Sequence, residues 1–320
     1  MHEIAFIHYT AIALIVGINS IGVGLGEGFS SITALESISR QPNARPHIIR
    51  TAIIGMALIE TAAIMGLLIA FLLLFGIQPE LQTWYSSLAE IGIALAICLV
   101  GFVIGIVSAW PVQAACQAIT RQPFFSQRIL GFMVMTQALI QTPLVAALII
   151  ALFIKIQLPD IVTISDSCRL IASGLTIGLG SIGPAIGLAL FAKTAVNGLG
   201  INRAAYNKLF SFTLISEAII ETPVIFSLVV AIILLFIVPK PQTDNTVASI
   251  AFLAAGLCTG IGTLGPGISS GKTAAAACKQ IAHNPKMHST LSRFSIFAQG
   301  LIETCAIYAI LISLMLILFV

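Results

Sequence analysis

The chain has 320 residues, of which 58% are hydrophobic and only 8% are charged, and its mean hydropathy is +1.07. Because about a quarter of the residues in an average soluble domain are charged, this composition excludes an ordinary soluble fold. The formal net charge of +3 comes without a basic patch interleaved with aromatic residues, so nothing indicates a nucleic-acid partner. The sequence predicts an all-α protein embedded in the lipid bilayer.

The predicted elements are long apolar segments that follow one another in pairs. Each segment is long enough to supply the roughly 20 apolar residues that cross a bilayer. In chain order we expect helices at 8–38 and 47–76, 86–118 and 126–155, 168–199 and 206–238, and 249–281 and 288–320. The first segment follows neither a charged leader nor a small-residue cleavage site, so we expect it to be retained. The sequence thus predicts eight transmembrane helices.

One phrase occurs in the second segment of every pair: "GMALIETAAIMG", "TQALIQTPLVAA", "SEAIIETPVIFS" and "AQGLIETCAIYA". Its alignment puts Glu60, Gln141, Glu221 and Glu303 in register, at intervals of 81, 80 and 82 residues. The first segment of each pair is rich in glycine, and a polar turn joins the two segments. Such repetition predicts four tandem helical hairpins, which we divide at 1–80, 81–160, 161–243 and 244–320.

The glycines have a mechanical interpretation. Gly22, Gly24, Gly26 and Gly28 recur at every second residue, and small residues let membrane helices approach closely. No strand precedes this run, which excludes a nucleotide-binding fingerprint. We therefore expect the glycine-rich helices to form a tight inner ring with the bulkier helices outside. Pro143 and Pro223 are expected to kink their helices, and the six cysteines, which form no CxxC pair, are expected to be small core residues.

Charge predicts the orientation. Most lysines and arginines lie in or beside the turns within hairpins; only Lys155, Arg169 and Lys240 lie in the segments that join hairpins. We assign to those joining segments the acidic residues Glu80, Glu90, Asp160, Asp166 and Asp244. By the positive-inside rule the hairpin loops are cytoplasmic and both termini are outside, as expected of a multi-pass protein of a bacterial plasma membrane.

The pattern resembles the c subunit, or proteolipid, of rotary ATP synthases. The resemblance is clearest in hairpin 1, where Glu36, Arg40, Gln41, Pro42 and Glu60 match the family pattern. It covers essentially the whole chain as four fused copies, although the loop motif weakens at 283–285 and is lost in hairpin 3. Most F-type c subunits are single hairpins, so the chain is F-like in motif and V-like in its fusion.

The resemblance implies an ion-carrying rotor. A carboxylate at the bilayer centre is costly when charged, so it must be protonated or hold a cation while it faces lipid. Glu60, Glu221 and Glu303 are then the ion carriers, and the partners are further copies in a cyclic ring, a stator a subunit with its arginine, and the central stalk. The stalk would contact the loops at Arg40, Gln41, Pro42, Arg121, Gln122 and Pro123. No cofactor is implied beyond the transported Na⁺ or H⁺.

Two more acids are candidates for the ion sites. Glu27 occupies the position where the family often has a glutamine near the ion, and the other hairpins have Ser108, Leu188 and Ser270 there. Glu217 lies one turn before Glu221, where the other copies have Met56, Gln137 and Gln299. Each is either an auxiliary carboxylate or a protonated structural one; two acids sharing a site would not both ionise.

The cargo and its stoichiometry depend on the neighbours of the acids. Thr61, Thr142, Thr222 and Thr304 follow the key positions, and such a hydroxyl resembles the family's sodium-coordinating pattern, so we expect sodium at Glu60, Glu221 and Glu303, with the proton as the alternative. Gln141 cannot exchange a proton, and hairpin 2 is expected to be a step without an ion. The ion-to-ATP ratio would then be reduced.

Other functions remain open. Fusion and the lost acid also fit a V- or A-type proteolipid that works as an ATP-driven pump. A secondary transporter is disfavoured because the repeats are parallel copies, without an inverted pair of broken helices. A purely structural proteolipid is disfavoured by the three aligned glutamates.

Overall fold

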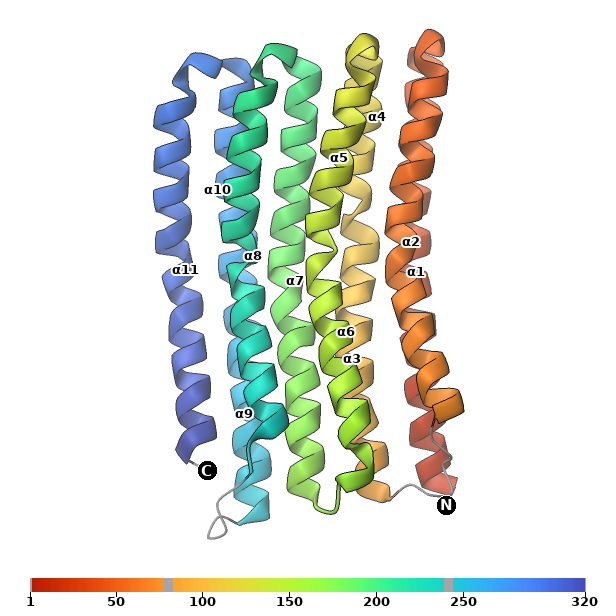
Figure 1. The fold of residues 1–320 in the computed structure, drawn as a ribbon, viewed down its shortest axis with the longest axis vertical. Helices are drawn as coiled ribbons and strands as arrows, with labels where there is room; N and C mark the ends of the chain where they lie inside the picture. The colour runs from red at the N-terminus through yellow and green to blue at the C-terminus, as the bar shows by residue number, and fades with distance from the viewer. Residues whose placement is uncertain (1, 77–82, 239–243, 320) are drawn as a thin grey trace.

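A computed structural model describes residues 2–76, 83–238 and 244–319. In these ranges the chain is almost entirely helical, and eight helical spans are long and apolar enough to cross a membrane, as predicted. Figure 1 shows them side by side, with both ends of the chain at one end of the bundle. Glu80 and Lys240 lie outside the described residues, as do the expected hairpin boundaries at residue 80 and residue 243.

Each hairpin has one glycine-rich span and one span that carries the repeated phrase. Hairpin 1 consists of α1 (His2–Arg40) and α2 (Arg45–Gly76), and hairpin 3 of α7 (Ile164–Ile201) and α8 (Tyr206–Phe236). The spans of the other two hairpins are interrupted. Hairpin 2 comprises α3 (Trp84–Val107), α4 (Ala109–Arg121), α5 (Ser126–Ile140) and α6 (Thr142–Gln157), and hairpin 4 comprises α9 (Asn245–Gly262), α10 (Leu264–His283) and α11 (His288–Phe319).

Prolines lie just after all three interruptions, which fall at Ser108, Gln141 and Thr263. Pro143 is the second residue of α6, where its missing N–H costs nothing. The kink expected at Pro143 stays a prediction, at a place where the structure interrupts the helix. In contrast, α8 continues through Pro223 without interruption.

The turns within hairpins share one geometry. In hairpin 1 a short 3₁₀ turn, Pro42–Ala44, follows Gln41 and leads directly into α2. Hairpin 3 lacks the proline but forms the same turn at Arg203–Ala205, because the Asn202 side chain accepts a hydrogen bond from the Ala204 N–H at 3.0 Å. The loss of the loop motif therefore leaves the turn intact.

The glycine-rich helices form a continuous inner row. Along this row α1 packs on α3, α3 on α7, and α7 on α9 and α10. The outer spans of the first three hairpins lie against their own inner partner and the next one, and α11 lies against its own inner partner, α9 and α10. A Cβ added to Gly26, Gly174 or Gly187 would collide with the carbonyl oxygen of Gly105, Gly92 or Gly267, respectively. Glycine thus permits backbone contact at each junction between neighbouring hairpins. The predicted close inner packing is confirmed.

Two expectations about individual residues change. Glu90 lies inside α3, fully buried against His8 of α1, with Nδ1 of the histidine 2.9 Å from Oε2 of the glutamate. Its assignment to a joining segment is wrong, and Lys155 in α6 and Asp166 and Arg169 in α7 also lie inside helices. All six cysteines are free, and Cys98, Cys116 and Cys278 are buried as expected, whereas Cys305 is exposed.

Candidate ion-binding site

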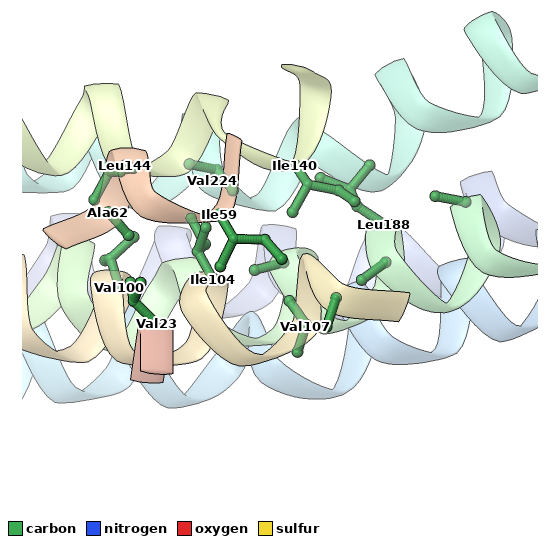
Figure 2. Packing of buried hydrophobic residues seen from close by; sticks show 14 of the residues in the cluster. Val23, Ile59, Ala62, Val100, Ile104, Val107, Ile140, Leu144, Leu188 and Val224 are labelled. Carbon is green, nitrogen blue, oxygen red and sulfur yellow. The ribbon is translucent and has the colours of Figure 1, made fainter. Parts of the chain in front are cut away.

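The repeated acidic positions lie near the middle of the outer spans. Glu60, Glu221 and Glu303 are in α2, α8 and α11, and Gln141 occupies the interruption between α5 and α6. Figure 2 shows the apolar side chains packed at this level, among them Ile59, which is fully buried next to Glu60. The polar groups therefore lie in an apolar layer, where a hydrogen bond is stronger than in water and an unpaired polar group costs more free energy.

Junction 1–2, where hairpins 1 and 2 meet at this level, has the most complete hydrogen bonding. The Gln141 Nε2 donates to the backbone carbonyl of Leu58 at 2.9 Å, and its Oε1 accepts from the Thr61 hydroxyl at 2.9 Å. The Thr61 hydroxyl also lies 2.7 Å from the Leu58 carbonyl oxygen. A side chain of one hairpin thus meets a hydroxyl and a carbonyl of the preceding hairpin.

Junction 3–4 pairs an acid with the corresponding threonine. The half-buried Glu303 carboxyl interacts with the Thr222 side chain of the preceding hairpin. Thr222 bonds the carbonyl four residues back, Ala218, at 3.3 Å, whereas Thr61, Thr142 and Thr304 bond the carbonyl three residues back at 2.7 Å. Within the described part of the chain, Glu303 Oε1 is buried without a hydrogen-bond partner.

Junction 2–3 places the next acid beside the next threonine. Glu221 and Thr142 line one apolar groove between α6 and α8, together with Val145, Val224 and Leu228. The acid of one hairpin and the threonine of the hairpin before it thus share a groove, in the same order along the row as at the other two junctions.

Glu60 has no preceding hairpin within the chain and is exposed on α2. Glu27, half-buried on α1 of the same hairpin, is close enough to Glu60 for their charges to repel. The structure thus brings together two of the acids predicted for this site.

A second polar register lies one turn before the first. Gln137, Glu217 and Gln299 are fully buried. Gln137 Nε2 donates to the carbonyls of Gly55 and Ser108, both at 3.2 Å, and Gln299 Nε2 donates to Ser295 and Ser216. Both carboxyl oxygens of Glu217 are buried without a hydrogen-bond partner in the described residues, and its charge would repel that of Glu221.

The predicted loop residues gather at the opposite end of the bundle from the termini (Figure 1). Arg40 forms an exposed ion pair with Glu36 at 3.8 Å, and Arg121 donates to the Asn197 side chain of hairpin 3 at 2.8 Å. Gln122 and Pro123 begin the next 3₁₀ turn. The turns within hairpins therefore lie at one end of the bundle, away from the acids in the middle of the outer spans.

Sequence reasoning missed several polar groups. The carbonyl of Leu58 carries no residue-type signal, because any residue supplies a backbone acceptor. Asn19 is buried with neither side-chain atom hydrogen-bonded in the described residues, and lies between Gly66 and Gly101. A polar residue in a glycine-rich membrane helix is the signal that could have singled it out.

Fold and site together define a class: a membrane protein of repeated helical hairpins with a carboxyl group midway along most outer helices. The family described as the C subunit of ATP synthase matches residues 10–73, 171–234 and 253–316, more than half of the chain. This protein belongs to that family.

Individual relatives align with about one hairpin. The chain is 52% identical over 63 residues to ATP synthase c subunit 2 of Cereibacter sphaeroides, an alignment that covers 20% of this chain and 76% of that protein. It is 48% identical over 64 residues to the ATP synthase c subunit of Natranaerobius thermophilus, covering 20% and 71%. For the ATP synthase c subunit of Dehalococcoides mccartyi the identity is 37% over 73 residues, covering 23% and 96%. The chain is therefore a fusion of c-subunit repeats and an integral membrane protein.

Proposed function

We propose that this protein is the ion-translocating rotor subunit of a rotary ATP synthase or ATPase. Glu60, Glu221 and Glu303 carry the ion, and ion flow is coupled to rotation of a ring. The observation that supports this most is the shared geometry of the junctions, where each acid or its amide faces a threonine of the preceding hairpin.

The physical chemistry follows from the apolar surroundings. A carboxyl group that faces lipid is stable only when neutral or paired with a cation, so it keeps its ion until it reaches water and a positive charge. In the proposed complex that charge is an arginine of a stator a subunit. Release and rebinding at successive hairpins then favour rotation in one direction.

In the proposed ring, further copies of the chain complete the circle, because every hairpin presents the same two faces. The Glu60 face of one copy then meets the Thr304 face of the next. Such head-to-tail contacts generate a ring when the rotation closes. The polar loops, including Arg40–Pro42 and Arg121–Pro123, face the central stalk on the cytoplasmic side of a bacterial plasma membrane.

The stoichiometry is lower than one ion per hairpin. Gln141 cannot release a proton or balance the charge of a cation, so each chain carries three ions on four hairpins. Fewer ions per turn at a fixed number of ATP molecules favour ATP-driven pumping against a steep gradient. This makes a V- or A-type pump the second candidate, and the stalk subunits that copurify with the ring distinguish the two. A repeat-built secondary transporter would copurify with neither set.

Sodium is the cargo that the threonine hydroxyls favour, because Na⁺ needs several oxygen ligands. The hydroxyls of Thr142 and Thr222 and the carbonyls beside them supply oxygens at two junctions, and Thr304 of a neighbouring copy would do so at Glu60. Thr61 faces Gln141, so in this scheme its hydroxyl lies at the one junction that carries no ion. Glu27 and Glu217 are auxiliary acids in this scheme.

Carbodiimide labelling of the assembled complex in membranes tests the proposal. Glu60, Glu221 and Glu303 should be labelled, and sodium should protect them. Labelling of the three acids that is indifferent to sodium would replace sodium by the proton. Absence of labelling at all three would overturn the proposed function.

A further inference from the structure

The amide of Gln141 fills the space between two hairpins with hydrogen bonds on both sides. Its N–H donates to the Leu58 carbonyl, and its oxygen accepts from the Thr61 hydroxyl, both at 2.9 Å. Neither polar atom of the amide is left unsatisfied. The Thr61 hydroxyl corresponds in the repeat to Thr222, which interacts with Glu303 at junction 3–4.

Gln137 extends this contact by one turn. Its Nε2 reaches the Gly55 carbonyl of α2 and the Ser108 carbonyl at the interruption between α3 and α4, each at 3.2 Å. Two amides of hairpin 2 thus bind two carbonyls of α2, Gly55 and Leu58. Hairpin 3 has acids at both corresponding positions, Glu217 and Glu221, and hairpin 4 has one amide and one acid.

The comparison with junction 3–4 shows what the amide replaces. There the Glu303 carboxyl faces Thr222, and its Oε1 is buried without a hydrogen-bond partner in the described residues. At junction 1–2 the corresponding group carries its own N–H, and this N–H makes the contact to the carbonyl that a bound proton or cation would make. The oxygen ligands of hairpin 1 are therefore present although the acid is absent.

We propose that junction 1–2 is a latent fourth ion site: its hydroxyl and carbonyl ligands from hairpin 1 are in place, and the Gln141 amide permanently occupies them. This inference rests on the proposed function. The ligand class is a monovalent cation or a proton, the same cargo as at the other junctions. Hairpins 1 and 2 consequently stay joined by the Gln137 and Gln141 amides of hairpin 2 as they move past the stator. One substitution, of Gln141, is enough to open the site.

A residue swap tests the inference. The variant Gln141→Glu with Glu303→Gln keeps three acids per chain and moves the gap from junction 1–2 to junction 3–4. In the assembled complex, the acid introduced at 141 should be labelled by carbodiimide at a rate similar to that of Glu221 in the same molecule, with the same response to added sodium. The ratio of ions to ATP should equal that of the unmodified complex.

Two further variants make the result specific. Adding Thr61→Val to Gln141→Glu should weaken sodium protection at 141, or increase the labelling rate if the cargo is a proton, by about threefold, the effect of a hydrogen bond of roughly 0.6 kcal/mol between membrane helices. Gln141→Met, which matches the amide in length without its hydrogen bonds, controls for packing and should leave Glu221 and Glu303 labelled as before.

The outcomes separate the inference from the proposed function. If the acid at 141 is unreactive, or responds to sodium differently while Glu60 and Glu221 respond normally, the latent site is refuted and the rotor function stands. If the swapped complex transports no better than Glu303→Gln alone, the latent site is also refuted. If Glu60, Glu221 and Glu303 of the unmodified chain all fail to react, the rotor function itself fails.

Discussion

Junctions 1–2 and 3–4 have the same backbone frame but different chemistry. Both have an inner glycine against a neighbouring carbonyl, Gly26 on Gly105 and Gly187 on Gly267. Both present a threonine of one hairpin to the next. Thr61 faces the Gln141 amide, whose N–H and oxygen are both hydrogen-bonded to hairpin 1, whereas Thr222 faces Glu303, which has one buried carboxyl oxygen without a partner in the described residues. The glycine contacts are therefore the same at a junction with an amide and at a junction with an acid, because the closest atoms are those of backbone carbonyls.

The largest predicted difference between the junctions follows from removing the acid. Glu303→Gln should abolish labelling at 303 and lower the ions carried per ATP to about two-thirds, because an amide in lipid has no proton to exchange. Gln141→Met should leave that ratio unchanged. Ion and ATP fluxes in vesicles containing the complex measure both; an unchanged ratio in Glu303→Gln would contradict the assignment of Glu303.

The shared frame predicts equal losses of stability at both junctions. Gly26→Ala and Gly187→Ala each place a methyl group against a backbone carbonyl and should destabilise by about 1–3 kcal/mol, as overpacking does. Gly24→Ala is the matched control, since nothing lies within 4 Å of its added Cβ. Thermal unfolding of the purified protein in detergent gives the comparison. Loss at only one of the two positions would show that the frames differ.

Substitutions at Gln137 and Gln299, in the second polar register, should show a smaller difference in stability between the junctions. Gln137→Leu leaves the carbonyls of Gly55 and Ser108 without their donor and should cost about 1 kcal/mol, within the range of hydrogen bonds between membrane helices. Gln299→Leu should cost less, because the shorter contacts of Gln299 are to Ser295 of its own helix and only Ser216 lies across the junction. Thermal unfolding also measures this pair, and equal costs would contradict the bridging role of Gln137.

The repeat made much of this predictable. Four copies of one phrase predicted the hairpins, the register of Glu60 with Gln141, and the close inner packing, because periodic apolar and glycine positions act locally. The partners of Gln141 were beyond such reasoning, since the Leu58 carbonyl becomes a ligand only through the vertical alignment of two neighbouring helices. Glu90 was misplaced for a related reason: a charged residue near a helix end resembles a loop residue until its partner, His8, is known.

The smallest predicted effect concerns the hydroxyl that faces each polar group. Thr222→Val removes the hydroxyl beside Glu303 while keeping the shape of the side chain, and should weaken ion retention at Glu303 about threefold, as expected for a hydrogen bond of roughly 0.6 kcal/mol between membrane helices. Thr61 faces Gln141 instead, so Thr61→Val should leave ion retention at Glu303 unaltered. Labelling of Glu303 at graded sodium concentrations resolves the difference. An equal shift in both variants would mean that the threonines act through general packing, and the two junctions would then differ in their acid alone.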